Sequence, residues 1–115
     1  MKRIRYSQDY KEKISRMRRY LDAYFGNEKR IKIFKQINTR IQSIKENENI
    51  GISVREMFCV DTEYRYIYEA KNYIFYRIDE NDIYIVNIYD EREDFMWKLF
   101  GIRTISQETE DYWKE

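Results

Sequence analysis

The chain has 115 residues, of which 43% are hydrophobic and 17% aromatic, with no proline and three glycines. This length suits one domain, and this composition is unlike that of disordered, collagen-like or disulfide-rich proteins. We therefore expect a single ordered domain over residues 1–115. The only cysteine, Cys59, has no internal disulfide partner and is expected to be a small packing residue.

Several classes of function are excluded by residues that are missing. Without histidine, zinc sites built from cysteine and histidine cannot form, and serine or cysteine hydrolases lack their usual base. Three scattered glycines supply neither phosphate-binding fingerprint. No run approaches the roughly 20 apolar residues of a membrane span, and no signal peptide follows the first basic residues. We expect no metal, no cofactor and no membrane contact, and a cytoplasmic location.

The formal net charge of +1 hides an uneven distribution. Residues 1–46 contain 14 Lys and Arg against 5 Asp and Glu, whereas residues 47–115 contain 8 against 16. Such asymmetry indicates either a basic face that attracts a polyanion or an acidic partner, or two solvated faces that differ in sign.

The first half of the chain predicts a short strand and a helical hairpin. Alternation favours a strand over residues 1–6, and Ser7 is a typical N-cap. Gly26 suits the end of the first helix and Asn27 the cap of the second, which leaves almost no loop. Core-facing positions recur with helical spacing at Tyr10, Ile14, Met17, Leu21 and Tyr24, and then at Phe34, Ile37, Ile41 and Ile44.

The second half predicts strands, after a turn that Gly51 permits. Residues 64–70, 73–78 and 83–89 are rich in aromatic and β-branched side chains. Their short connections require antiparallel neighbours, so they form a three-stranded meander. A short helix over 92–100 and a last helix capped by Thr104 or Ser106 complete an α+β fold, with two helices on one face of an antiparallel sheet and a single core.

Arginines lie among tyrosines in the predicted strands, as at Arg65 between Tyr64 and Tyr66 and at Arg77 after Tyr76. Arginine can hold a phosphate through two parallel hydrogen bonds, and aromatic rings can stack on unpaired bases. However, the period of two places Arg65 on the opposite face from its tyrosine neighbours. A nucleic-acid site and ordinary tyrosine packing with surface ion pairs both stay open.

The order of elements resembles that of the RelE/ParE toxins of bacterial type II toxin–antitoxin modules. The resemblance is carried by Gly51 to Met57 ahead of Tyr64 to Tyr68, by Asn72 to Asp79 and Ile83 to Tyr89, and by Arg92 to Phe95. It implies a growth-inhibiting toxin of the kind that stabilises plasmids, which forms a hetero-oligomer with a cognate antitoxin. The implied target is DNA gyrase, with no catalysis, or ribosome-bound mRNA, with endoribonuclease activity.

The resemblance also implies roles for individual residues. Arg55, Arg65 and Arg92 match basic positions that hold the scissile phosphate in the nucleases of this family, and Glu91 is the best placed carboxylate to accept a proton. Four further residues are expected to contact the target or the antitoxin: Arg77, Tyr89, Phe95 and Trp97. The acidic surroundings Asp90-Glu91 and Glu93 depart from the basic pattern of the nucleases, so a non-catalytic, non-toxic interaction domain with the same fold is the alternative.

Overall fold

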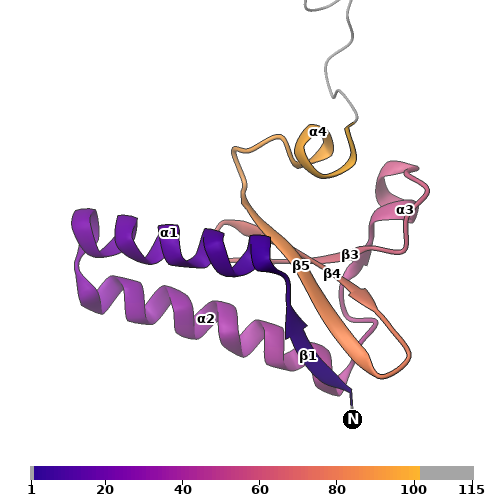
Figure 1. Cartoon of the computed structure of the whole chain (residues 1–115), viewed down its shortest axis with the longest axis horizontal. Helices are drawn as coiled ribbons and strands as arrows, with labels where there is room; N and C mark the ends of the chain where they lie inside the picture. Colours follow the sequence, from indigo (N-terminus) through magenta and orange to yellow (C-terminus); the bar gives the residue numbers. More distant parts are fainter. Residues whose placement is uncertain (1, 102–115) are drawn as a thin grey trace, which may run out of the picture.

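The computed structural model describes residues 2–101, with the backbone alone at Trp97. A five-stranded sheet is flanked by a long helical hairpin and by two short helices (Figure 1). The elements in chain order are β1 (Arg3–Tyr6), α1 (Gln8–Phe25), α2 (Asn27–Glu46), β2 (Ile52–Ser53), α3 (Val54–Phe58), β3 (Arg65–Glu69), β4 (Asn72–Ile78), β5 (Asp82–Asp90) and α4 (Phe95–Phe100). The α+β class is confirmed. The last predicted helix, with Thr104 or Ser106 as its cap, lies outside the described residues.

The hairpin begins as the sequence predicts and turns more tightly than expected. The side chain of Ser7 accepts a hydrogen bond from the backbone N–H of Tyr10 at 3.0 Å, which caps α1. Gly26 has a φ of 85° and serves both as the C-cap of α1 and as the N-cap of α2. The prediction that Asn27 caps the second helix is therefore wrong, because one glycine in a conformation disfavoured for other residues makes the whole turn.

The sheet contains more strands than the predicted meander. The antiparallel strands β3, β4 and β5 confirm that meander, while β2 adds two residues at one edge and β1 lies at the other. The expectation of a wholly antiparallel sheet is wrong, because β1 runs parallel to β5, with Arg3 opposite Asp82. Pairing shifts between Phe75 and Tyr76 of β4, so that Val86 of β5 is an extra residue in a bulge.

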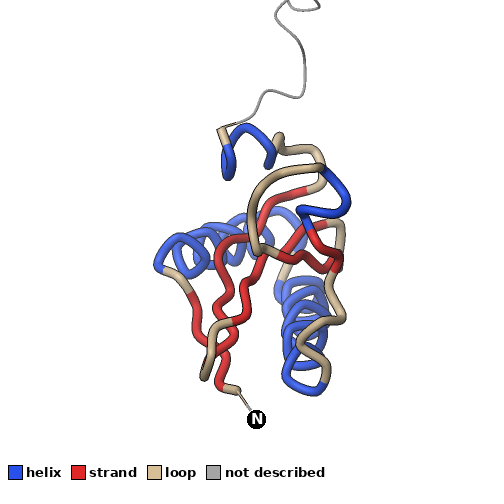
Figure 2. Tube along the Cα trace, turned by 90° about the vertical axis from the view of Figure 1, so that its right-hand side faces the viewer, coloured by secondary structure: helices blue, strands red, loops and turns tan. Residues whose placement is uncertain are grey.

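The core consists of two clusters, one on each face of the sheet, and not of the single core expected. The hairpin covers one face with Ile37, Ile41 and Ile44, which pack with Ile67, Ile74, Tyr76, Ile83, Ile85 and Ile88 of the strands. The other face carries Tyr66, Phe75 and Tyr89 with Val54 of α3, and residues of α4 pack against them. Side chains alternate along each strand, so a sheet buried on both faces needs two sets of partners. Figure 2 shows α3 and α4 at the end of the molecule away from the N-terminus.

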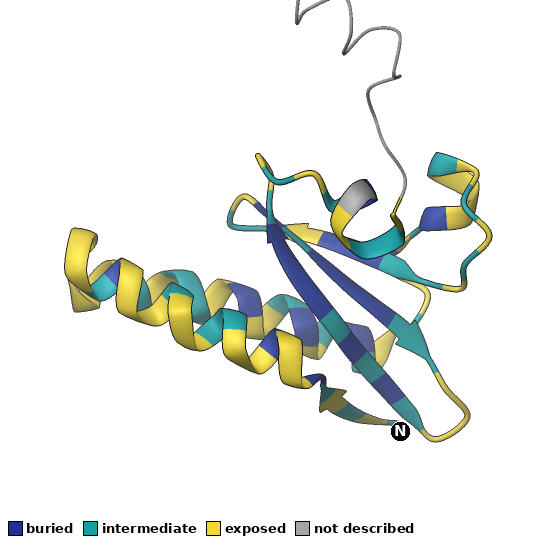
Figure 3. Ribbon diagram, turned by 45° about the horizontal axis from the view of Figure 1, so that its top comes forward, coloured by how far each residue is buried: buried dark blue, intermediate teal, exposed yellow. Residues whose placement is uncertain are grey.

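The tip of the hairpin projects beyond the sheet and is exposed, as Figures 1 and 3 show. Leu21 is the last residue of α1 that is buried. Tyr24 continues the helical spacing of the core positions, but it is exposed because no strand lies beneath it. The prediction that Tyr24 faces the core is wrong for this reason.

A buried tyrosine fastens the connection between α2 and β2. The hydroxyl of Tyr76 accepts a hydrogen bond from the backbone N–H of Gly51 at 2.8 Å and donates one to the carbonyl of Glu48 at 2.9 Å. A Cβ atom at Gly51 would lie 2.5 Å from that hydroxyl and 2.9 Å from the carbonyl oxygen of Tyr66. Glycine is thus required here for a close approach of side chain and backbone.

Candidate functional site

The sheet face opposite the hairpin carries a cluster of aromatic rings, which we call the aromatic face and define as Tyr66, Tyr73, Phe75, Tyr89 and Phe95. The ring of Phe95, on α4, lies with its centroid 5.1 Å from those of Tyr73 and Phe75, a distance typical of favourable aromatic pairs. Alternation along β3 and β4 places these tyrosines on one side. Phe95, predicted as a contact residue, is therefore partly committed to holding α4 on the sheet.

Arg65 opens β3 on the hairpin side of the sheet, opposite Tyr76 in the register. One of its guanidinium nitrogens donates to the carbonyl of Gly51 at 2.8 Å. As the alternation predicts, this arginine does not share a face with Tyr66. Its guanidinium thus binds the same connection that the Tyr76 hydroxyl fastens.

Three other predicted arginines each form an ion pair with an aspartate close in sequence. Such exposed pairs contribute little to stability, because water and salt screen their charges. The guanidinium of Arg92 hydrogen-bonds the carboxylate of Asp90 and holds the pKa of that carboxyl below its usual value. The pairs are Arg55 with Asp61 at 3.1 Å, Arg77 with Asp79 at 3.2 Å and Arg92 with Asp90 at 2.9 Å.

Glu91 lies at the end of β5 and accepts a hydrogen bond from the hydroxyl of Tyr68. This bond to a carboxylate raises the pKa of Tyr68 to about 12. The hydrogen bond that Arg92 donates to the carboxylate of Asp90 is the main cause of the raised pKa of Arg92, and the charge of Glu91 adds to it. The predicted base and one predicted arginine are therefore neighbours.

Tyr89 has a cationic partner that the sequence did not indicate. Lys13 of α1 places its Nζ 3.5 Å from the centroid of the Tyr89 ring and donates to the carbonyl of Ile88 at 3.0 Å. Burial lowers the pKa of Lys13, while the nearby Glu93 opposes that shift. No spacing in the sequence relates residue 13 to residue 89, so only the packing of α1 on β5 brings them together. The side chain of Trp97 lies outside the described residues.

The predicted arginines do not gather in one place. In the strand register, Arg65 pairs with Tyr76 of β4, whereas Asp90, the partner of Arg92, pairs with Asn72 of β4. These positions are four residues apart along β4, or about 13 Å at roughly 3.3 Å per residue. Arg55 follows β2 at the Arg65 end.

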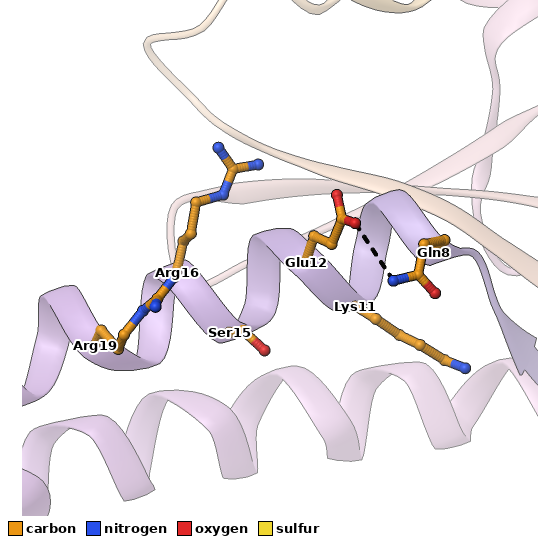
Figure 4. A pocket seen from close by; sticks show the side chains of 6 residues that line it. All are labelled: Gln8, Lys11, Glu12, Ser15, Arg16 and Arg19. Carbon is orange, nitrogen blue, oxygen red and sulfur yellow. Dashed lines mark hydrogen bonds between the residues drawn. The ribbon is translucent and has the colours of Figure 1, made fainter.

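An open depression of about 380 Å³ lies along the outer side of α1, lined by Gln8, Lys11, Glu12, Ser15, Arg16 and Arg19 (Figure 4). The side chain of Gln8 donates to Glu12 at 3.4 Å, and Arg16 points away from α2. All six residues belong to one helix, so no second element within residues 2–101 contributes to the lining. This depression therefore offers no enclosed site for a small molecule.

Two further features bear on the kinds of site that this fold contains. Among the residues described, no group of three or more Cys, Asp and Glu side chains is arranged to hold a metal ion. No helix within residues 2–101 has the length and apolar character needed to cross a membrane.

Cys59, expected to be a packing residue, is instead exposed at the C-cap of α3, with a left-handed backbone.

The arrangement of strand, helical hairpin and sheet is shared with a known toxin structure. The structure titled "Chromosomal ParDE TA system from P. aeruginosa" superposes with a TM-score of 0.64 and 14% sequence identity, over 78% of this chain and 96% of that chain. At this identity the likeness establishes the fold. No curated protein sequence matches the chain.

The family of the chain is established by its sequence. The profile of the family described as "ParE toxin of type II toxin-antitoxin system, parDE" matches residues 4–95, from β1 to the start of α4. The chain therefore belongs to the ParE toxin family. It is a ParE-type toxin of a type II toxin–antitoxin system, as the resemblance predicted.

Proposed function

We propose that this toxin inhibits DNA gyrase by binding it, uses no catalytic group of its own, and acts in the cytoplasm. The observation that carries the proposal is the separation of Arg65 from Arg92 along the sheet. Cleavage of RNA needs cationic groups arranged in advance around one phosphate. Here Arg65 is bound to the backbone of Gly51, and Arg55 and Arg92 pair with their own aspartates.

The proposed regulator is a cognate antitoxin with an acidic, disordered segment that folds on binding. Segments of this kind commonly add to a sheet edge or lay an amphipathic helix in a groove. Here the basic hairpin supplies charge complementarity, because residues 1–46 carry 14 Lys and Arg against 5 Asp and Glu. The complex is a hetero-oligomer in which Arg77, Tyr89, Phe95 and Trp97 are the proposed contacts with target or antitoxin.

A second candidate is a member of this toxin family that retains the fold as a non-catalytic interaction domain and is not toxic. The ion pairs of Arg55, Arg77 and Arg92 favour it, because an aspartate of the same chain already neutralises part of the charge that each arginine could offer to a target. However, these pairs are exposed and weak, so they would not prevent the arginines from binding a target. Toxicity in cells separates the two candidates.

The first experiment is expression of the protein from an inducible promoter, with and without a small gene that neighbours the toxin gene in the genome. Growth arrest that the neighbouring gene relieves supports a toxin with an antitoxin. Unchanged growth supports the interaction domain. Two proteins that purify separately and do not bind each other would reject the antitoxin proposal.

The second experiment assigns the target. The purified protein is expected to inhibit supercoiling by gyrase and to leave mRNA on ribosomes uncut. If the protein binds gyrase, Arg92 is proposed to contact this target instead of a phosphate, and Arg92→Ala is expected to weaken inhibition about 10-fold, since arginine is frequent among the residues that dominate interfaces. Arg3→Ala, on the edge strand β1 beside the start of β5 and so at the other end of that strand from Arg92, is the matched control. Cut mRNA, with about a 100-fold loss in Arg65→Ala, would instead identify a nuclease.

A further inference from the structure

The tip of the hairpin presents three aromatic rings to solvent. Tyr20, Tyr24 and Phe25 are 54%, 72% and 50% exposed. The ring of Tyr20 lies 4.8 Å from that of Tyr24 and 6.1 Å from that of Phe25, measured between centroids. Single exposed apolar residues are ordinary, but a contiguous group at one corner of a molecule marks an interaction site.

A row of cations and polar side chains adjoins these rings on α2. The Nζ of Lys29 lies 4.2 Å from the centroid of the Phe25 ring. Lys32, Gln36 and Thr39 follow at intervals of three and four residues, so they share a helix face with Lys29, and all are exposed. Residues 29–45 contain six Lys and Arg and no carboxylate. Within residues 2–101, neither Lys29 nor Lys32 forms an ion pair.

We propose that this surface, consisting of Tyr20, Tyr24, Phe25, Lys29 and Lys32 and called here the tip surface, binds single-stranded nucleic acid. Bases stack on the tyrosine rings, while the two lysines neutralise adjacent phosphates. A duplex fits less well because its bases are already stacked. The carboxylates of an acidic peptide such as poly-glutamate would pair with the lysines but would not stack on the rings as bases do.

The tip surface lies at the end of the hairpin farthest from the strands (Figure 1). It therefore shares no residue with the arginines at the ends of the sheet, and the proposal goes beyond gyrase inhibition. The same stacking chemistry serves DNA and RNA, and both are used as probes below.

The test is fluorescence anisotropy with the full chain and labelled probes of fifteen units: oligo-dT, oligo-U, a DNA duplex and poly-glutamate. We expect oligo-dT or oligo-U to bind at least about 10-fold more tightly than the duplex or poly-glutamate. Tyr24→Ala is expected to weaken binding about 10-fold or more, whereas Tyr24→Phe keeps the ring and stays within about 2-fold of the parent. Circular dichroism and thermal unfolding verify that each variant is folded.

Charge variants test where the strand lies. The pair Lys29→Gln and Lys32→Gln is expected to reduce the slope of log affinity against log salt by about 1.4, since each phosphate contact on a single strand contributes about 0.7. The matched control is the pair Lys11→Gln and Lys45→Gln, which removes the same charge near the sheet. Equal effects of both pairs, equal binding of the duplex or poly-glutamate, no binding of either strand, or full binding by Tyr24→Ala would each overturn the proposal.

Discussion

The Tyr76 hydroxyl offers a direct test of how the α2–β2 connection is held. Tyr76→Phe removes one oxygen atom from a side chain that is completely buried. The backbone N–H of Gly51 and the carbonyl of Glu48 both lose a partner. The ring and its packing on the hairpin stay the same, so the substitution isolates the two hydrogen bonds.

The expected loss of stability follows from those two groups. A buried backbone group without a partner costs about 1–3 kcal/mol. Two such groups, the carbonyl retaining some access to water, give about 3 kcal/mol, a large part of the roughly 5–15 kcal/mol that stabilises a typical domain. With a slope of about 1.5 kcal/mol per molar urea, the unfolding midpoint falls by about 2 M.

Urea unfolding monitored by circular dichroism measures this change. Tyr68→Phe is the matched control, because it removes a hydroxyl whose partner, Glu91, is exposed and can bind water. We expect the control to shift the unfolding midpoint much less than Tyr76→Phe does. Equal losses in the two variants, or a loss below about 1 kcal/mol in Tyr76→Phe, would refute the argument that the buried hydroxyl fastens this connection.

Two further predictions concern the core and the end of the sheet. Ile41→Asp is expected to abolish cooperative unfolding, since it buries an unpaired carboxylate at a fully buried position, whereas Ile31→Asp at the exposed tip is tolerated. Tyr68 is expected to titrate near pH 12, and nearer pH 10 in Glu91→Gln, as followed by absorbance at 295 nm. Because the pKa of Tyr68 is raised in the folded state, the hydroxyl's contribution to stability is present below pH 10 and is lost between pH 10 and about 12. If the Glu91→Gln variant titrates as the parent does, the Glu91 hydrogen bond is not the cause of the raised pKa.

Local patterns predicted most of the elements, because the residues that define each one are neighbours in sequence. The spacing of Ile37, Ile41 and Ile44 fixes the buried side of α2, and alternation fixes the faces of β3 and Arg65. The parallel pairing of β1 with β5 leaves no local pattern. With two residues, β2 is too short for alternation to be visible.

The candidate site was less predictable, since its geometry depends on where the elements stop. Tyr24 fits the period of a core residue, yet the sheet ends before it reaches that turn of α1. The contact of Lys13 with Tyr89 needs α1 to cross β5. The sequence identified the arginines as candidate site residues, but it did not show what each one contacts. Those contacts depend on the neighbouring aspartates and on the strand register.

The pairing of the first strand with the last one sets the order in which the toxin is completed during translation. Arg3 is opposite Asp82, and the backbone N–H of Ser7 donates to the carbonyl of Ile85 at 2.9 Å. At about 10 residues per second, roughly 8 s separate the synthesis of these two strands. A chain that stops before β5 has no partner for β1 and no anchor for the start of α1. The edge of the sheet is thus finished only on a nearly complete polypeptide, and prematurely terminated chains lack it.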